Sequence, residues 1–406
     1  MTLLKKSLIQ LSARLNAAHP VQRRQAKQFR SIAENGTKRA VPEDVTVRQA
    51  AHGSRYGRRG KVMYLSVSDA HFLIGGLPFC GQSRTIYGRL PESLLRRGLR
   101  PDLEKMGRCP AGGYLRFTTD SKNIEIRMTL LNIMEFPHMP PTGATGADVY
   151  VGNGEGFFWY GCFTPEKLLP AAIRIDMAFQ TREKRDIYVY FPLFAEIGHI
   201  VAGLDSDAIL FAPGREKLQK PIAVYGSSIT QGCACSRAGL AYTALLSRML
   251  ETDVYNFGFS GAARGEPFLA RLLAGLDISA LVMEYDHNAS VDELMRTHET
   301  FYRLIRKRQP GLPIVLLSRL SGGVSVPQQE ASERSAIIRK TFESAVARGD
   351  RNIYFIDGGS ALPEVTRSDF FVDGKHPNDR GMAAIASLLF ETLARIEDKV
   401  PPARVQ

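Results

Sequence analysis

The chain has 406 residues, of which 44% are hydrophobic and 23% charged, and its formal net charge is +12. This composition excludes a disordered chain, and the length suits two domains with large cores. No run of about 18 apolar residues occurs, which excludes a membrane-spanning helix. No helix-turn-helix, zinc-finger or RNP-like pattern occurs either, so we expect no nucleic-acid partner. The positive charge indicates a basic surface, or attraction of an anionic substrate.

Residues 1–55 are basic and polar. Leu4, Leu8, Leu11 and Leu15 recur at helical spacing and predict a short amphipathic helix, followed by a connector.

Residues 56–212 have a different sequence pattern, in which short apolar runs alternate with turn residues. This density of short strands, without a long helical pattern, predicts an all-β sandwich domain resembling a jelly roll. We expect the aromatic run Phe157–Tyr160 to lie in the core of this sandwich, with a sugar-stacking platform as the alternative. The expected strands are 62–67, 113–117, 124–130, 147–151, 157–163, 172–179, 185–191 and 196–201.

Residues 213–400 alternate between buried-type strands and amphipathic helices. This alternation predicts a parallel sheet covered on both faces, in a flavodoxin-like three-layer α/β/α domain. The expected strands are 221–225, 253–257, 279–285, 312–318 and 352–357, and the expected helices are 242–250, 267–276, 291–308, 330–347 and 379–396.

Polar clusters follow three of these strands and precede the last helix. Because reactive groups in such sheets lie beyond the carboxyl ends of the strands, we expect the clusters to meet in one crevice. Their sequences are Gly226-Ser227-Ser228-Ile229-Thr230, Asn256-Phe257-Gly258-Phe259-Ser260-Gly261, Glu284-Tyr285-Asp286-His287-Asn288 and Asp373-Gly374-Lys375-His376-Pro377.

A serine becomes a strong nucleophile when a histidine removes its proton and a carboxylate orients that histidine. Asp373 and His376 are three residues apart, which lets the carboxylate reach Nδ1 while Nε2 faces Ser228. The backbone N–H groups of Ser228 and Gly261 and the side-chain amide of Asn288 are candidate oxyanion donors.

The four clusters, in this order, resemble those of the SGNH or GDSL hydrolases across residues 219–398. The resemblance implies a catalytic triad of Ser228, Asp373 and His376, with Gly261 and Asn288 in the oxyanion hole. Two positions depart from the family pattern. Ser227 replaces its usual aspartate, and Asp286 replaces its usual glycine.

The stretches Tyr87–Pro91 and Leu115–Ser121 resemble the β-sandwich that precedes the hydrolase domain in one subgroup of the family. That subgroup includes carbohydrate esterases and an antibiotic-pathway acyltransferase.

Several other residues near these clusters are candidates for roles in the site. Arg264, Glu266, Asp286 and His287 are candidates for shaping the substrate pocket. Ser260 is a rival nucleophile, but it lacks the Gly-x-Ser-x-Gly pattern because Ala262 occupies the last position.

The five cysteines are Cys80, Cys109, Cys162, Cys233 and Cys235. Their odd number implies no disulfide framework, and Cys233-Ala-Cys235 lacks the spacing of a zinc site. We therefore expect reduced thiols, a cytoplasmic location, no metal and no cofactor.

The leading expectation is a serine esterase that cleaves a small acyl ester, acetyl above all, from a carbohydrate or another hydroxylated substrate. An acyltransferase with the same triad is the first alternative, and a non-catalytic carbohydrate-binding protein is the second.

Overall fold

The computed structural model describes residues 45–46, 58–59, 62–80, 87–152, 156–167, 171–212, 220–320, 328–362 and 366–397. The predicted N-terminal helix lies outside these residues. The expected domain boundary after residue 212 lies next to residues 213–219, which are also outside the described residues. The domain limits therefore stay predictions.

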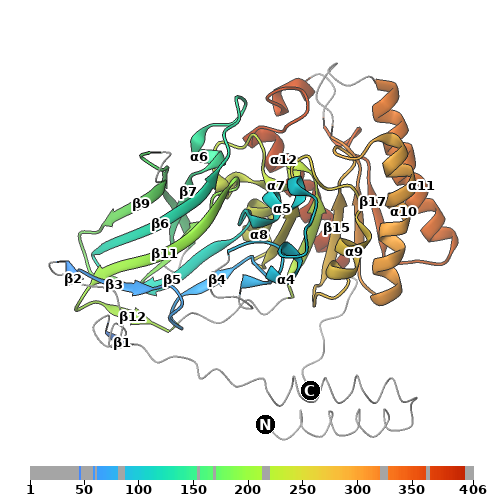
Figure 1. Ribbon diagram of the computed structural model, residues 1–406. Helices are drawn as coiled ribbons and strands as arrows, with labels where there is room; N and C mark the ends of the chain where they lie inside the picture. The colour runs from blue at the N-terminus through green and yellow to red at the C-terminus, as the bar shows by residue number, and fades with distance from the viewer. Residues whose placement is uncertain are drawn as a thin grey trace, which may run out of the picture. The chain divides into compact units, whose positions relative to one another are not determined.

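The first part of the chain forms two antiparallel sheets, as the short strands predict (Figure 1). One sheet has the order β1-β12-β5-β10-β7-β8, with β4 also paired to β5, and the other has the order β2-β3-β11-β6-β9. The strands are β1 Val45–Thr46, β2 Arg58–Arg59, β3 Val62–Ser66, β4 Leu73–Gly75, β5 Tyr114–Thr119, β6 Asn123–Ile133, β7 Ala147–Gly152, β8 Phe157–Phe163, β9 Ala172–Ala178, β10 Arg185–Tyr190, β11 Ala195–Asp205 and β12 Ile209–Phe211.

The core of this β-rich part lies between the two sheets. In β9, every second side chain is buried, so that Ile173, Ile175 and Met177 face inward. They join a cluster that includes Phe117 of β5 and Ile187 of β10, from the opposite sheet. Alternation with a period of two residues therefore buries one face of β9, as in other sandwiches, whereas β7 and β10 are buried along nearly their whole length.

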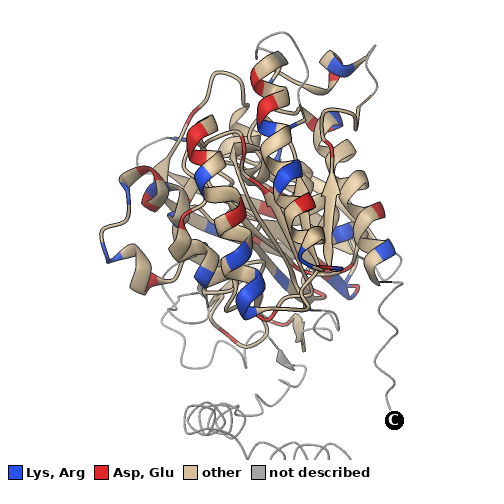
Figure 2. Cartoon of the chain, turned by 90° about the vertical axis from the view of Figure 1, so that its right-hand side faces the viewer, with Lys and Arg blue, Asp and Glu red and all other residues tan. Residues whose placement is uncertain are grey.

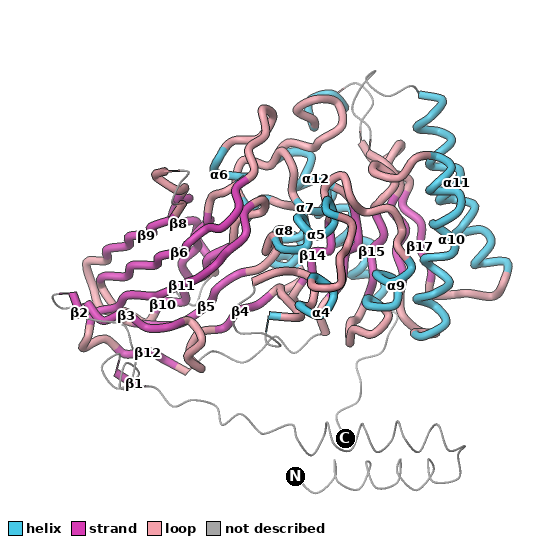
Figure 3. The backbone as a smooth tube through the Cα atoms, in the orientation of Figure 1, coloured by secondary structure: helices cyan, strands magenta, loops and turns pink. Residues whose placement is uncertain are grey.

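The second part has a parallel sheet with the order β14-β13-β15-β16-β17, which is the predicted flavodoxin-like arrangement. Helix α10 packs against both α9 and α11, and α8 packs against α12 (Figure 3). The strands are β13 Ile222–Gly226, β14 Val254–Gly258, β15 Ala280–Glu284, β16 Ile314–Leu317 and β17 Ile353–Ile356. The helices are α7 Ser228–Gln231, α8 Tyr242–Met249, α9 Pro267–Leu273, α10 Val291–Arg308, α11 Gln328–Ala347 and α12 Asp379–Glu397.

Several short elements were not expected from the sequence, and all of them except α5 have four residues or fewer, which is too short to show a period. They are β1, β2, β4, β12, the helices α4 Glu92–Leu95, α5 Pro101–Arg108 and α6 Pro141–Ala144, α7, and the 3-10 helices η2 Ala238–Leu240 and η3 Arg367–Phe370. α5 begins with a proline, whose fixed φ suits the first helical position.

The β-rich part and the parallel-sheet part share one hydrophobic cluster. Tyr114, Tyr190 and Phe194 of the former belong to the same buried cluster as Tyr225 and Phe257 of the latter. The two parts are therefore packed together over an extensive apolar contact.

None of the helices in the described residues is long and apolar enough to cross a membrane. On the face that Figure 2 shows, basic and acidic residues are interspersed over the helices and do not gather in one basic patch.

Candidate active site

Ser228 is the first residue of α7, directly after β13. The turn before it requires glycine at position 226, where a Cβ atom would lie 1.9 Å from Thr230 Oγ1 and 2.7 Å from Glu284 Oε2. Ser227 caps the short helix, because its Oγ accepts a hydrogen bond from the Ile229 N–H at 3.1 Å. Together these contacts hold Ser228 at the carboxyl end of the sheet.

The structure brings Ser228, His376 and Asp373 into one hydrogen-bonded chain. Ser228 Oγ lies 3.0 Å from His376 Nε2, and His376 Nδ1 lies 2.8 Å from Asp373 Oδ2. The other carboxylate oxygen of Asp373 accepts the backbone N–H of His376 at 2.7 Å, which fixes the loop before α12. The contact to Asp373 favours the tautomer in which Nε2 carries the free lone pair.

The protonation states in this chain suit a general base. Burial lowers the pKa of His376, against the opposing effect of Asp373, so the ring is neutral at neutral pH. Burial tends to raise the pKa of Asp373, but hydrogen bonds from the backbone and ring of His376 and from the Lys375 amide lower it to about 2.

The candidate oxyanion donors lie in the loops after β13, β14 and β15. The backbone N–H groups of Ser228 and Gly261 donate to no atom of the residues that the structure describes. Gly261 has φ of +68°, in the left-handed region that favours glycine. Asn288 Nδ2 donates to the Phe259 carbonyl at 3.0 Å, and its second N–H has no acceptor among the described residues. Their roles as oxyanion donors stay predictions.

A buried carboxylate lies under the nucleophile turn. Glu284, the last residue of β15, accepts hydrogen bonds from Ser227 Oγ at 3.0 Å, the Ser227 N–H at 3.2 Å and Thr230 Oγ1 at 2.6 Å. Burial raises its pKa to about 7, partly offset by these donors. Sequence analysis placed Glu284 in the third cluster but gave it no role.

Two of the four candidate pocket residues have their charged groups turned toward the protein. Glu266 Oε2 accepts the Tyr225 hydroxyl at 2.7 Å, and its Oε1 lies 3.2 Å from Arg100 Nη2. Asp286 is 1% exposed and accepts the backbone N–H of Arg319 at 3.0 Å. Burial raises the pKa of its carboxyl group.

The other two candidates differ in exposure. His287 is buried, and burial holds its pKa well below the ordinary value, so its ring is neutral. Arg264 is partly exposed, with guanidinium nitrogens 3.7 Å from Asp102 and 3.9 Å from Glu293. A substrate-shaping role stays a prediction for all four residues.

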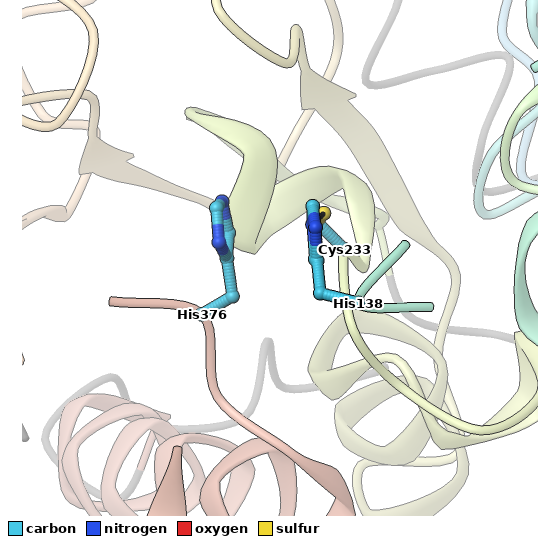
Figure 4. A group of neighbouring side chains, drawn as sticks. All are labelled: His138, Cys233 and His376. Carbon is cyan, nitrogen blue, oxygen red and sulfur yellow. Dashed lines mark hydrogen bonds between the residues drawn. The ribbon is translucent and has the colours of Figure 1, made fainter. Parts of the chain in front are cut away.

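The β-rich part contributes a histidine that sequence analysis missed. His138 follows β6, and its ring stacks on that of His376 with centroids 4.9 Å apart and planes 14° apart (Figure 4). His138 Nε2 lies 3.2 Å from the Sγ atom of buried Cys233, in the loop after α7. No local pattern could have revealed this neighbour, because it comes from a distant segment.

The expectation that Phe157–Tyr160 lie in the sandwich core is wrong. These four side chains are exposed on β8, which is the last strand of its sheet, and Trp159 is 54% exposed. The indole N–H of Trp159 donates to Asp148 at 2.7 Å, and the Arg237 guanidinium lies 4.7 Å from its ring centroid. Trp159 is therefore an exposed aromatic side chain held in place by polar partners.

This combination defines a class of protein: a three-layer α/β/α fold with a serine, a histidine and an aspartate at the carboxyl edge of its parallel sheet, joined to an antiparallel β-rich part. Residues 219–394 match the GDSL-like lipase/acylhydrolase family, and residues 62–210 match the N-terminal domain of SGNH-hydrolase-type esterases. The chain belongs to the GDSL/SGNH hydrolases and is an esterase or an acyltransferase.

Solved structures with the same fold cover both parts of the chain. One, described as a GDSL-like lipase of Bacteroides ovatus, has 24% identity and a TM-score of 0.75 over 83% of this chain and 98% of its own. A salicylyl-acyltransferase from a tetracycline biosynthetic pathway has 18% identity and a TM-score of 0.68, over 84% and 99%. An acetyl xylan esterase of Butyrivibrio proteoclasticus has 12% identity and a TM-score of 0.56, over 84% and 99%. None of the curated proteins matches the sequence significantly.

Proposed function

We propose that this chain is a serine esterase that removes a small acyl group, acetyl above all, from a carbohydrate or another hydroxylated substrate. The observation that carries the proposal is the continuous hydrogen-bonded chain from Ser228 Oγ through His376 to Asp373, with distances of 3.0 and 2.8 Å.

Each residue has a defined part in the proposed reaction. His376 Nε2 takes the proton of Ser228 as Oγ attacks the ester carbonyl, and Asp373 stabilises the imidazolium that forms. The negative oxygen of the tetrahedral intermediate is met by the N–H groups of Ser228 and Gly261 and by the Asn288 amide. His376 then protonates the leaving alcohol, and water cleaves the acyl-enzyme in a second, equivalent cycle.

Two observations support a carbohydrate substrate. The exposed aromatic run of β8 offers flat apolar faces, with Trp159 fixed by Asp148 and Arg237. One solved structure of similar fold is an acetyl xylan esterase. Within this substrate class, the net charge of +12 would favour anionic members.

The decisive test compares Ser228→Ala with Ser260→Ala on a chromogenic acetyl ester. Ser228 begins α7 and Ser260 lies in the loop after β14, so both are at the carboxyl edge of the sheet, and Ser260 is the rival nucleophile. We expect Ser228→Ala to lower kcat by a factor on the order of 10⁴ or more, with an unchanged circular dichroism spectrum. We expect the kcat of Ser260→Ala to stay close to that of the unsubstituted enzyme. A folded Ser228→Ala protein with normal turnover would contradict the proposal.

An acyltransferase is the second candidate, because the same acyl-enzyme can be resolved by an alcohol in place of water. The similarity to the salicylyl-acyltransferase fold favours including it. Adding sugar acceptors to the assay and measuring the ratio of transferred to hydrolysed acyl groups separates the two activities.

We also propose that the protein works in the cytoplasm. All five cysteines are unpaired thiols, which suits a reducing compartment.

A further inference from the structure

We propose that His138, Cys233 and His376 form a binding site for Zn²⁺ or a similar thiophilic divalent cation, and that the bound cation inhibits the enzyme. The three side chains come from three separate segments: the loop after β6, the loop after α7 and the loop before α12. They offer two imidazole nitrogens and one sulfur atom that all lie within 4.8 Å of one another (Figure 4).

The ligand set suits such a cation. Zn²⁺ binds imidazole nitrogen at about 2.0–2.1 Å and thiolate sulfur at about 2.3 Å, in a tetrahedral arrangement. His138 Nε2 and Cys233 Sγ are already 3.2 Å apart. The rings of His138 and His376 are nearly parallel, so their lone pairs must turn toward a common point. His138 is only partly buried, and its ring would have to turn away from its stacked position on His376 to make that contact.

Asp373 prepares His376 for this role. Its bond to Nδ1 leaves the lone pair on Nε2, and a carboxylate behind a metal-binding histidine is the usual outer-shell arrangement of zinc sites. The fourth coordination position would face Ser228, whose Oγ lies 3.0 Å from His376 Nε2.

A second group of candidate ligands, Glu284, Asp286 and His287, is less suited to a soft cation. It has no sulfur ligand, and its three residues are all buried, whereas His138 and His376 are only partly buried. Glu284 is also committed to Ser227 and Thr230. We therefore place the site at Cys233.

Binding exchanges a proton for the metal. The Cys233 thiol must lose its proton to solvent as the sulfur–metal bond forms, so binding releases a proton. The inhibition rests on the proposed function, because it requires His376 to act as the base. The binding of the cation does not depend on the proposed function.

The test measures binding and inhibition separately in the full chain. Zn²⁺ should inhibit ester hydrolysis reversibly, with activity restored by a chelator. Co²⁺ should give the near-ultraviolet thiolate charge-transfer band and should do so in Ser228→Ala as well, where there is no hydrolysis to measure. Cys233→Ser and His138→Ala should each raise the half-inhibitory Zn²⁺ concentration at least about tenfold relative to each variant's own activity, since even a lost outer-shell partner costs about 10–100-fold.

Matched controls are Cys235→Ser and His199→Ala. Cys235 is also buried and lies two residues from Cys233, but its Sγ donates to the Gly232 carbonyl at 3.0 Å, and His199 is exposed on β11. Both should keep the inhibition and the Co²⁺ band. Loss of the band in Cys235→Ser but not in Cys233→Ser, or no band in the unsubstituted protein, would overturn the site. A band without hydrolysis would support the site while contradicting the proposed function.

Discussion

Arg89 offers a sharp test of how the β-rich part supports the catalytic part. It lies between β4 and α4, is 1% exposed, and forms no salt bridge with an acidic residue that the structure describes. Its guanidinium instead donates to carbonyl oxygens of Met106 at 2.5 Å, Cys109 at 2.8 Å and Asn256 at 3.3 Å, to the Gly258 carbonyl, and to Asn256 Oδ1 at 3.3 Å. Asn256 and Gly258 belong to β14, which leads into the loop of Gly261.

We expect Arg89→Met to lower the free energy of unfolding by about 2–4 kcal/mol. The substitution keeps most of the stem but removes about four hydrogen bonds, because the two N–H groups of Nη1 are shared among three acceptors. Each bond is worth about 1 kcal/mol, and the relief of burying a charge offsets part of that loss. This is a large share of a total stability of about 5–15 kcal/mol. Chemical denaturation followed by fluorescence and circular dichroism measures it.

Arg96→Met is the matched control for this experiment. Its side chain is 77% exposed directly after α4, and its one ion pair among the residues that the structure describes is with Glu92 one turn away, so its loss should change stability by less than about 0.5 kcal/mol. If Arg89→Met lowers the free energy of unfolding by less than about 1 kcal/mol, or if both variants lower it equally, the role given to Arg89 is refuted.

The remaining predictions concern the catalytic residues and the two parts of the chain. Because a protonated His376 cannot accept the serine proton, kcat/KM should fall as the pH drops, with an apparent pKa below 6.5; a midpoint above that value would contradict the lowered pKa of the ring. Asn288→Ala should lower kcat by about 10²–10³ with little change in KM, and a change in KM alone would remove Asn288 from the oxyanion hole. An isolated fragment of residues 215–400 should be poorly soluble or much less active, because it would expose the cluster shared with Tyr114 and Phe194; a soluble fragment with unchanged kcat/KM would show that the β-rich part is only an appendage.

The sequence predicts the parallel sheet well because its strands are short and mostly buried. All five residues of β13 and of β15 are buried, and such apolar runs between amphipathic helices are typical of a parallel sheet. The Asp373–His376 pair was also predictable, since its members are close in the sequence and their contact is local.

Contacts between distant segments could not be predicted in this way. Arg89 and Asn256 are 167 positions apart, and His138 and Cys233 are 95 apart. Each of these residues is unremarkable in its local sequence, and only the packing of the two parts brings them together. The wrong placement of Phe157–Tyr160 has a related cause, because an aromatic run looks the same in a core strand as on the exposed face of an edge strand.

The position of Glu284 shows how strand pairing can preserve a chemical group that a sequence motif lacks. Ser227 stands where related hydrolases usually have an aspartate, so the motif alone suggests that no carboxylate lies near the nucleophile turn. In the parallel register of β13 and β15, however, Glu284 lies directly beside Gly226. Because Gly226 has no side chain, the Glu284 carboxylate can approach the turn and accept the Ser227 N–H, the Ser227 hydroxyl and the Thr230 hydroxyl. The register of the sheet thus supplies an acidic group beneath Ser228 from a strand that is more than fifty residues away along the chain.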